Sequence, residues 1–169
     1  MELVDLRSII EIPGKKKEFS YSPDLDETAG DSVLYYIPPS LAVGEIVNKA
    51  GVLTLSATVE ATQRCICAKC MSEFDVSLNE QITAYIVQAE DNLDDSELYF
   101  YDDDVVDVDL IIKTELIINR PVSLYCIEDC AGLCEKCGHD LNHGNCDCKD
   151  EVDERLIALQ QLLDELEEE

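Results

Sequence analysis

The amino-acid sequence predicts an α+β protein: a mainly antiparallel β domain with a long hairpin, followed by a cysteine-rich segment and a C-terminal helix. Apolar and polar residues alternate over residues 52–62 and 74–86, which predicts paired strands. Six cysteines fall within residues 126–148, and apolar residues recur at helical spacing near the end of the chain. The chain then divides into a β-rich domain (1–122), a cysteine-rich segment (123–149) and an amphipathic helix (150–169).

The β-rich domain begins with short strands. Residues 2–12 predict a strand or leading segment that ends at the Pro13-Gly14 turn, and residues 18–22 predict a second strand. Residues 33–51 are apolar but are interrupted by Pro38-Pro39 and by two glycines. Proline and glycine interrupt regular structure, so strands or loops are favoured there over a helix.

The hairpin is the clearest regular element. A period of two places one face of a strand in the core and the other in water. The apolar positions are Leu53, Leu55, Ala57, Val59 and Ala61 in the first run, and Phe74, Val76, Leu78, Ile82, Ala84 and Ile86 in the second. We expect the two runs to pair as one long hairpin with Cys67 and Cys70 at its tip.

An acidic stretch precedes the one helix expected in this domain. Residues 90–109 contain ten acids, interrupted by the aromatic residues 99–101, for which an ordinary strand end is favoured over a docking surface. Asp109 is a suitable N-cap for a helix near 109–118, which ends before Pro121. Its expected packing stripe contains Leu110, Lys113, Thr114 and Ile117, with Ile112 and Leu116 beside it.

The cysteine-rich segment has the spacing C-x3-C-x3-C-x2-C-x8-C-x-C, and three further cysteines lie at residues 65–70. Two thiolates two residues apart can bind one tetrahedral ion while backbone amides fold over the sulfurs, and zinc is the usual ion for all-sulfur sets. Gly132 and Gly138 flank the Cys134–Cys137 step, where a tight turn needs a positive φ. The sequence therefore predicts one or two structural Zn²⁺ ions.

Eight of the nine cysteines are enough for two four-sulfur sites. Cys65 is the spare, because strand parity places it on the inward face, where a thiol packs like an apolar residue. The predicted metal ligands are Cys67, Cys70, Cys126, Cys130, Cys134, Cys137, Cys146 and Cys148. In one partition the last four close a local site, and the first four form the other. In the rival partition, Cys67 and Cys70 join Cys134 and Cys137 in a zinc ribbon. His139 and His143 are alternative ligands, although loop positions suit them better.

Disulfides and redox chemistry explain the cysteines less well. The first residues contain no long apolar stretch or cleavage site of a secretory signal, so we expect a cytoplasmic protein, in which disulfides are rare. The Cys67–Cys70 step lies between two strand patterns, without the helix that follows a thioredoxin-like pair. No apolar run approaches the length of a membrane span, so we expect no membrane partner.

The last residues predict a helix with one apolar stripe. Apolar residues step by four and three positions at Val152, Leu156, Leu159, Leu163 and Leu166. We expect the stripe to cover the β domain or to lie partly free, with contact to a partner or a second copy as the alternative.

The charge restricts the partners. Thirty-eight acidic residues against twelve Lys and Arg give a formal net charge of −26. Such a protein repels phosphate backbones and attracts basic proteins. Residues 15–17 form a lysine triplet, which suits a solvated strand edge better than an RNA contact.

Several motifs occur together in one order: CAKCM followed by EF, VDLIIKTELIINRPVSLYC, EDCAGLCEKCGHDLNHGNCDC, and DER at the start of the last helix. In this order and spacing the chain resembles the YceD family, the large ribosomal RNA subunit accumulation proteins of bacteria and plastids, over residues 45–165. The resemblance implies a non-enzymatic factor needed for normal levels of 23S ribosomal RNA, with the eight predicted ligands at the family's cysteine positions. Where the family often has Asp-Pro-Arg, this chain has Asp153-Glu154-Arg155, which weakens the helix start.

Together these observations predict ribosome biogenesis through a basic ribosomal protein or assembly factor, with ribosomal RNA reached indirectly. The alternatives are a zinc-dependent or thiol-based enzyme (oxidoreductase or nuclease) and a direct RNA-binding protein. A nuclease needs carboxylates that converge from separate elements, whereas the acids of 90–109 occupy one stretch. Zinc-bound thiolates are shielded, which disfavours an oxidoreductase.

Overall fold

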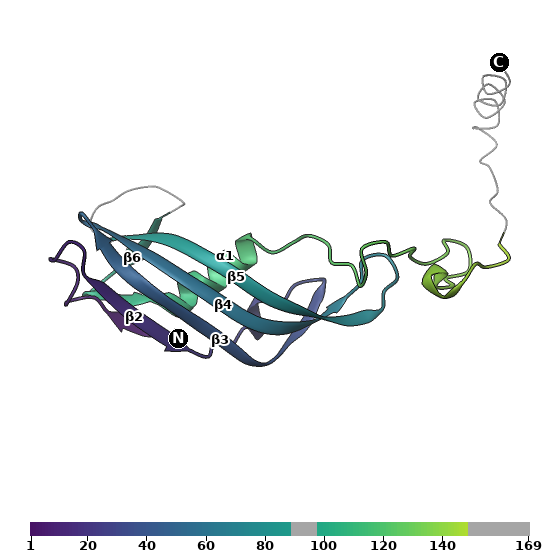
Figure 1. Cartoon of the computed structure of the whole chain (residues 1–169), viewed down its shortest axis with the longest axis horizontal. Coiled ribbons are helices and arrows are strands. Elements are labelled where there is room, and N and C mark those ends of the chain that lie inside the picture. Colours follow the sequence, from purple (N-terminus) through teal and green to yellow (C-terminus); the bar gives the residue numbers. More distant parts are fainter. Residues whose placement is uncertain (89–97, 149–169) are drawn as a thin grey trace, which may run out of the picture. The chain divides into compact units, whose positions relative to one another are not determined.

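Five strands form one mixed sheet in the computed structural model, which describes residues 1–88 and 98–148 (Figure 1). In spatial order they are β2 (Lys16–Tyr21), β3 (Val33–Lys49), β4 (Val52–Ile66), β5 (Glu73–Gln88) and β6 (Leu98–Tyr101). Strands β2 to β5 pair antiparallel, whereas β5 and β6 pair parallel. The predicted α+β class with mainly antiparallel pairing is therefore confirmed, and the parallel edge strand is the exception.

The remaining elements are short. Strands β1 (Leu3–Asp5) and β7 (Val105–Asp107) form a separate antiparallel pair, and β7 leads directly into helix α1 (Val108–Ile118). The described residues also include the 3-10 turns η1 (Asp26–Thr28) and η3 (Leu141–His143). The chain forms two compact units, Met1–Cys130 and Ala131–Glu169, so that the cysteine-rich segment contributes residues to both.

Strands β4 and β5 follow the alternation of the sequence. They pair antiparallel from Leu53 opposite Ile86 to Ile66 opposite Glu73. In β4 the odd-numbered positions are buried from Leu53 to Cys65, and in β5 the even-numbered positions point inward. Since side chains of a strand alternate between its faces, this register gathers the apolar residues of both strands on one side of the sheet.

Strand β3 extends past the interruption that its prolines create. Proline has no N–H to donate, so it is tolerated where strand pairing is broken. Pro38 and Pro39 lie within the register shift between Ile37 and Leu41, and they precede Ala42, where pairing with β2 begins. Of the strands or loops expected over residues 33–51, the structure thus forms a strand as far as Lys49. Ala50 and Gly51, both with positive φ, form the tight turn into β4.

The absence of a side chain at one glycine of β3 lets an aromatic ring from the neighbouring strand lie over it. Phe19 of β2 pairs with Gly44 of β3. A Cβ at Gly44 would lie 2.7 Å from the Phe19 ring and 2.6 Å from the carbonyl oxygen of Ser56. The ring therefore covers a position that only glycine can occupy, an arrangement that compensates for the missing side chain.

Helix α1 starts earlier than the sequence predicts. The side chain of Asp107, not Asp109, caps the helix by accepting hydrogen bonds from the N–H groups of Asp109 and Leu110. The expected packing stripe is also wrong, because Leu110 and Ile117 are exposed while the buried face contains Val108, Ile111, Ile112 and Leu116. The helix is thus rotated about its own axis relative to the expectation, so that a different face meets the core.

Asp109 is the second residue of the helix, and it is buried instead of capping the helix. Its carboxylate lies 3.1 Å from Lys113 Nζ and 3.0 Å from the amino group of Met1, and it accepts a hydrogen bond from the hydroxyl of Tyr21. Burial alone would raise the pKa of Asp109, but these hydrogen bonds hold it below its ordinary value. The acid therefore remains ionised inside the domain.

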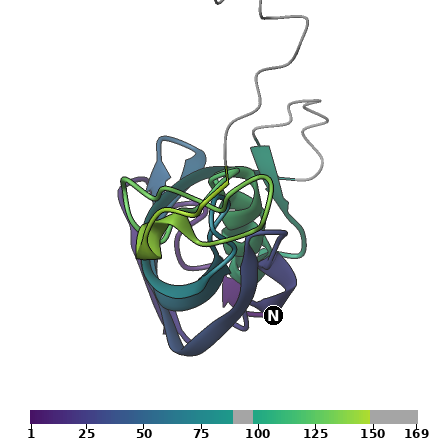
Figure 2. The same cartoon turned by 90° about the vertical axis from the view of Figure 1, so that its right-hand side faces the viewer.

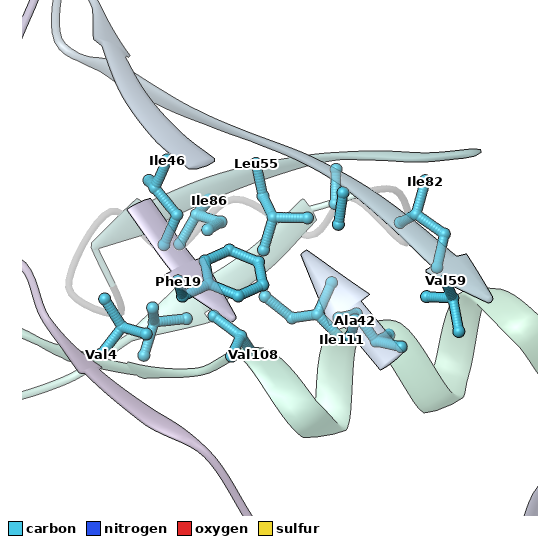
Figure 3. Packing of buried hydrophobic residues seen from close by; sticks show 14 of the residues in the cluster. Val4, Phe19, Ala42, Ile46, Leu55, Val59, Ile82, Ile86, Val108 and Ile111 are labelled. Atoms are coloured by element: carbon cyan, nitrogen blue, oxygen red, sulfur yellow. The ribbon is translucent and has the colours of Figure 1, made fainter. Parts of the chain in front are cut away.

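The hydrophobic core lies between α1 and one face of the sheet (Figure 2). Figure 3 shows Ile46, Leu55 and Ile86 of the sheet on one side, and Val108 and Ile111 of α1 on the other. Phe19 fills the space between them. Since α1 is a single short helix, the opposite face of the sheet has no helix over it within residues 1–88 and 98–130.

Two sequence expectations lie outside the described residues: the C-terminal helix at 150–169 and the first part of the acidic stretch at 90–97. Within the described part of the chain, no helix has the length and apolar content needed to cross a membrane.

Candidate metal centres

The structure brings eight cysteines together as two sets of four. Cluster 1 contains Cys67, Cys70, Cys126 and Cys130, and cluster 2 contains Cys134, Cys137, Cys146 and Cys148. Within each set all four sulfurs lie within 4.8 Å of one another. This grouping is the local partition, and it excludes the zinc-ribbon pairing of Cys67 and Cys70 with Cys134 and Cys137.

The sulfur distances fit a tetrahedral thiolate site. In cluster 1, the Sγ atoms of Cys67 and Cys130 are 3.7 Å apart, and those of Cys70 and Cys126 are 3.6 Å apart. Four sulfurs at about 2.3 Å from a central zinc ion lie about 3.8 Å from one another. The donor set therefore matches zinc in both chemistry and spacing.

Cluster 1 is formed by the turn between β4 and β5 and by the chain that follows α1. The N–H of Cys67 donates to Ser72 O over 2.9 Å, and the N–H of Met71 donates to Cys67 O over 3.0 Å, which closes the turn. Met71 has a φ of 60°, the left-handed conformation that such a turn requires. The N–H of Ala68 donates to Leu124 O over 2.8 Å and so holds the second chain segment against the turn.

A cationic side chain adds to this contact. Lys69 Nζ lies 5.3 Å from the centre of the Tyr125 ring, within the range of a cation–π interaction. The lysine beside Cys70 and the tyrosine beside Cys126 thus join the two halves of the site.

The electrostatics of cluster 1 favour a bound cation. Burial would raise the pKa of Cys67, but the N–H groups of Cys70, Cys126 and Lys69 donate to its sulfur and lower the pKa to about 6. Burial and contact with Cys70 raise the pKa of Cys126 to about 12. Thiolates this close repel one another, so they do not all ionise unless a positive ion lies between them.

Cluster 2 lies on the second unit and has the backbone of a metal-binding knuckle. The N–H of Cys134 donates to His139 O, and the N–H of Gly138 donates to Cys134 O, both over 2.8 Å. Gly138 takes a φ of 71°, which explains the glycine after the C-x2-C step. The N–H groups of Cys137 and Lys136 donate to the Cys134 sulfur and lower its pKa to about 6.

Two polar residues that the sequence analysis did not single out brace cluster 2. Asp140 accepts hydrogen bonds from the backbone and side-chain N–H groups of Asn142, over 2.9 and 2.7 Å. Asn142 in turn accepts from the N–H of Ala131 over 2.8 Å. The sequence signal is a D-x-N step between the cysteine pairs, typical of an Asx turn.

The two clusters differ in their surroundings. In cluster 1, Cys67, Cys70 and Cys130 are buried, whereas Cys137 and Cys148 of cluster 2 are exposed. Gly132 is the one fully buried residue between 131 and 148. Cluster 1 is therefore largely shielded from solvent, while cluster 2 has almost no apolar interior.

The other candidate ligands lie outside both clusters. Cys65 is fully buried on the inward face of β4, as strand parity predicts, and belongs to neither set. Burial raises the pKa of its thiol. Among the described residues neither His139 nor His143 joins a set of potential ligands, and His143 is exposed beside Asp140.

The remaining sequence features have structural roles. Lys16 of the lysine triplet lies 2.7 Å from Glu18 and 3.0 Å from Glu45 on the edge strand. Tyr99 donates its hydroxyl to Glu115 over 2.7 Å, and Tyr101 is buried. Tyr99 and Tyr101 of strand β6 thus contact the core, as expected of a strand end, whereas Phe100 between them is exposed.

Comparison with known proteins points to one family. The model of a family described as "Large ribosomal RNA subunit accumulation protein YceD" matches residues 55–163. The chain is also 26% identical over 160 residues to the Bacillus subtilis (strain 168) protein YlbN, which is described as uncharacterized, covering 90% of this chain and 91% of that protein. No solved structure is significantly similar.

Proposed function

The chain belongs to the YceD family, and we propose that it is a non-enzymatic factor in the biogenesis of the large ribosomal subunit, needed for the accumulation of 23S ribosomal RNA. Membership of the family supports the ribosomal role. The charge and the two cysteine clusters support the manner in which we propose that the protein acts.

Each cysteine cluster binds one structural Zn²⁺ ion in this proposal. Sulfur–sulfur distances of 3.6 and 3.7 Å in cluster 1 support it, because they match the edges of a zinc–thiolate tetrahedron. With four protein ligands on each ion, no position remains for a water or a substrate, which separates a structural zinc site from a catalytic one. Bound thiolates are also shielded from thiol exchange, so the same clusters do not act as redox pairs.

The protein reaches ribosomal RNA through a basic protein, either a ribosomal protein or an assembly factor. The observation that carries this part is the net charge of −26, together with the way in which cations are held on the surface. Lys16, Arg64 and Lys113 each contact two carboxylates. Cations neutralised in this way attract phosphate weakly, whereas the excess of carboxylates attracts a cationic protein over long distances.

The proposal is tested in cells that lack the gene. Wild-type protein is expected to restore the level of 23S ribosomal RNA, and the tagged protein is expected to retain a basic ribosomal protein or assembly factor after ribonuclease treatment. The association should weaken steeply as salt increases, because exposed charges are screened. Replacement of Asp102, Asp103 and Asp104 by asparagine should weaken it more than replacement of the lysine triplet at 15–17.

One result favours the direct RNA-binding alternative. If the purified protein binds a fragment of 23S ribosomal RNA tightly at physiological salt, and loss of the lysine triplet abolishes binding, the indirect route is wrong. Loss of the partner after ribonuclease treatment leads to the same conclusion.

A further inference from the structure

Helix α1 has a second apolar face, which points to solvent. Leu110 is 61% exposed, Ile117 47% and Ile118 67%. Residues seven and eight positions apart lie on the same side of a helix, so these three side chains form one row. Thr114 lies within the row and donates its hydroxyl to Leu110 O over 2.8 Å, so its polar group is already engaged by the helix backbone. A surface row of this kind on an otherwise well-packed helix is typical of an interaction site.

The row continues past the end of the helix into a hollow. Val122 is 95% exposed, and with Ile117 and Pro121 it lines a depression of about 220 Å³. Asp31, Ser32 and Arg120 also line it. The hollow therefore offers an apolar wall with a carboxylate beside it.

Carboxylates border the apolar row, and the nearby cations are already engaged. Turn η1 packs against α1 and presents Asp26 and Glu27. Lys113 lies between Asp109 at 3.1 Å and Glu27 at 3.4 Å. Arg120 donates to Thr28 O over 2.9 Å, with its guanidinium against Gly30. The surface around the row is therefore negative.

The negative charge around the row determines which kind of segment can bind there. Residues 150–169 carry nine acidic residues and one arginine, so the negative surface disfavours the chain's own C-terminal segment as the occupant. A second copy of the chain brings another net charge of −26. A cationic segment is attracted instead, and its apolar side chains can bury Leu110, Ile117 and Ile118.

We propose that the exposed row of α1, formed by Leu110, Ile117, Ile118 and Val122, is the docking surface for a lysine- or arginine-rich amphipathic segment of a partner protein. The identity of the partner as a ribosomal component rests on the proposed function, whereas the surface itself rests on exposure and charge. The apolar row provides most of the affinity, and the carboxylates of η1 and Asp31 orient the segment and accelerate its association.

The test uses the full chain and a synthetic peptide of leucine and lysine with leucines at helical spacing. A second peptide has the same composition, with the leucines placed off that spacing. Ile117→Ser combined with Ile118→Ser should weaken binding of the first peptide by about tenfold or more. Leu41→Ser combined with Val43→Ser is the matched control, since both residues are similarly exposed on the sheet, at 43% and 47%. The control should leave the affinity unchanged.

Charge is tested by Glu27→Gln combined with Asp31→Asn, which should weaken binding severalfold at low salt and little at high salt. Unchanged circular dichroism and thermal midpoint show that the variants fold. Equal binding of both peptides, or equal loss in the isoleucine and control variants, overturns the proposal because binding is then only electrostatic. Sedimentation of the wild-type chain as a dimer, and of the isoleucine variant as a monomer, assigns the surface to a second copy and also overturns it.

The experiments can refute the docking surface and the proposed function independently of each other. If the isoleucine variant loses peptide binding but restores 23S ribosomal RNA fully in cells, the surface is correct and its role in ribosome assembly is wrong. If the variant binds the peptide normally, the surface is wrong whatever happens to the RNA.

Discussion

Replacing one cysteine ligand in either cluster should remove the ion of that cluster and disturb only the part of the chain that the cluster holds. The two variants are Cys137→Ser in cluster 2 and Cys67→Ser in cluster 1. We expect each variant to lose about one of two zinc ions. Cys137→Ser should also unfold residues 131–148, whereas Cys67→Ser should leave these residues unchanged and loosen the β4–β5 turn.

The magnitude follows from what residues 131–148 bury. Ordering a residue costs about 1–2 kcal/mol, so eighteen residues cost on the order of 20 kcal/mol. The large apolar side chains there, Leu133 and Leu141, are only partly buried and contribute about 1–2 kcal/mol each. A structural zinc ion contributes about 10–16 kcal/mol, the largest favourable contribution available to this unit. Without it, the folded form of residues 131–148 cannot persist.

The first unit responds differently because it has a core. Leu55, Ile86 and Ile111 are among many side chains buried between the sheet and α1. Loss of the cluster 1 ion removes the attachment of residues 126–130 but leaves this core intact. The strands should therefore keep their protection from hydrogen exchange in both variants.

The assays are zinc content by mass spectrometry and hydrogen exchange followed by peptide. In Cys137→Ser, amides of 131–148 should exchange at the rate of an unfolded chain, and those of β4 and β5 should exchange as in the wild type. The reasoning is refuted if residues 131–148 remain protected after zinc is lost, or if both variants unfold the whole chain.

Three further predictions concern the first unit. Cys65→Ala should retain both zinc ions and reduce the free energy of unfolding by about 1 kcal/mol or less, and a lower zinc content would show that Cys65 is a ligand. Gly44→Ala should destabilise by about 2 kcal/mol in urea denaturation, because its Cβ meets the Phe19 ring and backbone; a neutral effect would contradict the close approach. Asp109→Asn should cost about 3 kcal/mol at neutral pH, since Lys113 loses a buried partner. The pKa of Asp109 lies below its unfolded value of about 3.9, so this difference should be constant above that pH and shrink as the pH falls further; a constant difference down to strong acid would argue against it.

The strands and cysteine sets follow from local patterns, and these the sequence predicts well. Alternation places the odd-numbered residues from Leu53 to Cys65 on one face of β4, because side chains of a strand alternate with a period of two whatever strands lie beside it. The knuckle at Cys134 and Cys137 is equally local, since the turn and its glycine lie within a few residues. The division of the cysteines between the two sites depends on the tertiary fold, because it requires residues 124–130 to lie against the turn between β4 and β5, as the hydrogen bond from Ala68 N–H to Leu124 O shows.

Features that depend on tertiary contacts were predicted less well. Asp107 and Asp109 are equally good caps in the sequence VVDVDL, and the choice depends on the pairing of β7 with β1, which ends the strand at Asp107. The apolar residues of α1 cover most of its surface, so the sequence pattern did not distinguish the stripe that meets the sheet from the one that faces water. The parallel pairing of β6 joins residues that no local signal connects.

Cluster 1 has a consequence for the order of events during synthesis of the chain. Cys67 and Cys130 are 63 positions apart, and Cys70 and Cys126 are 56 apart. At about 5–20 residues per second, the ribosome delivers the second pair of thiols roughly 3–12 s after the first. Hairpins form in microseconds, so β4 and β5 can pair long before the site is complete. The ion that we propose for cluster 1 is therefore acquired after β4 and β5 have paired, and zinc shortage during translation should yield chains whose hairpin is formed but whose residues 126–130 are not attached to it.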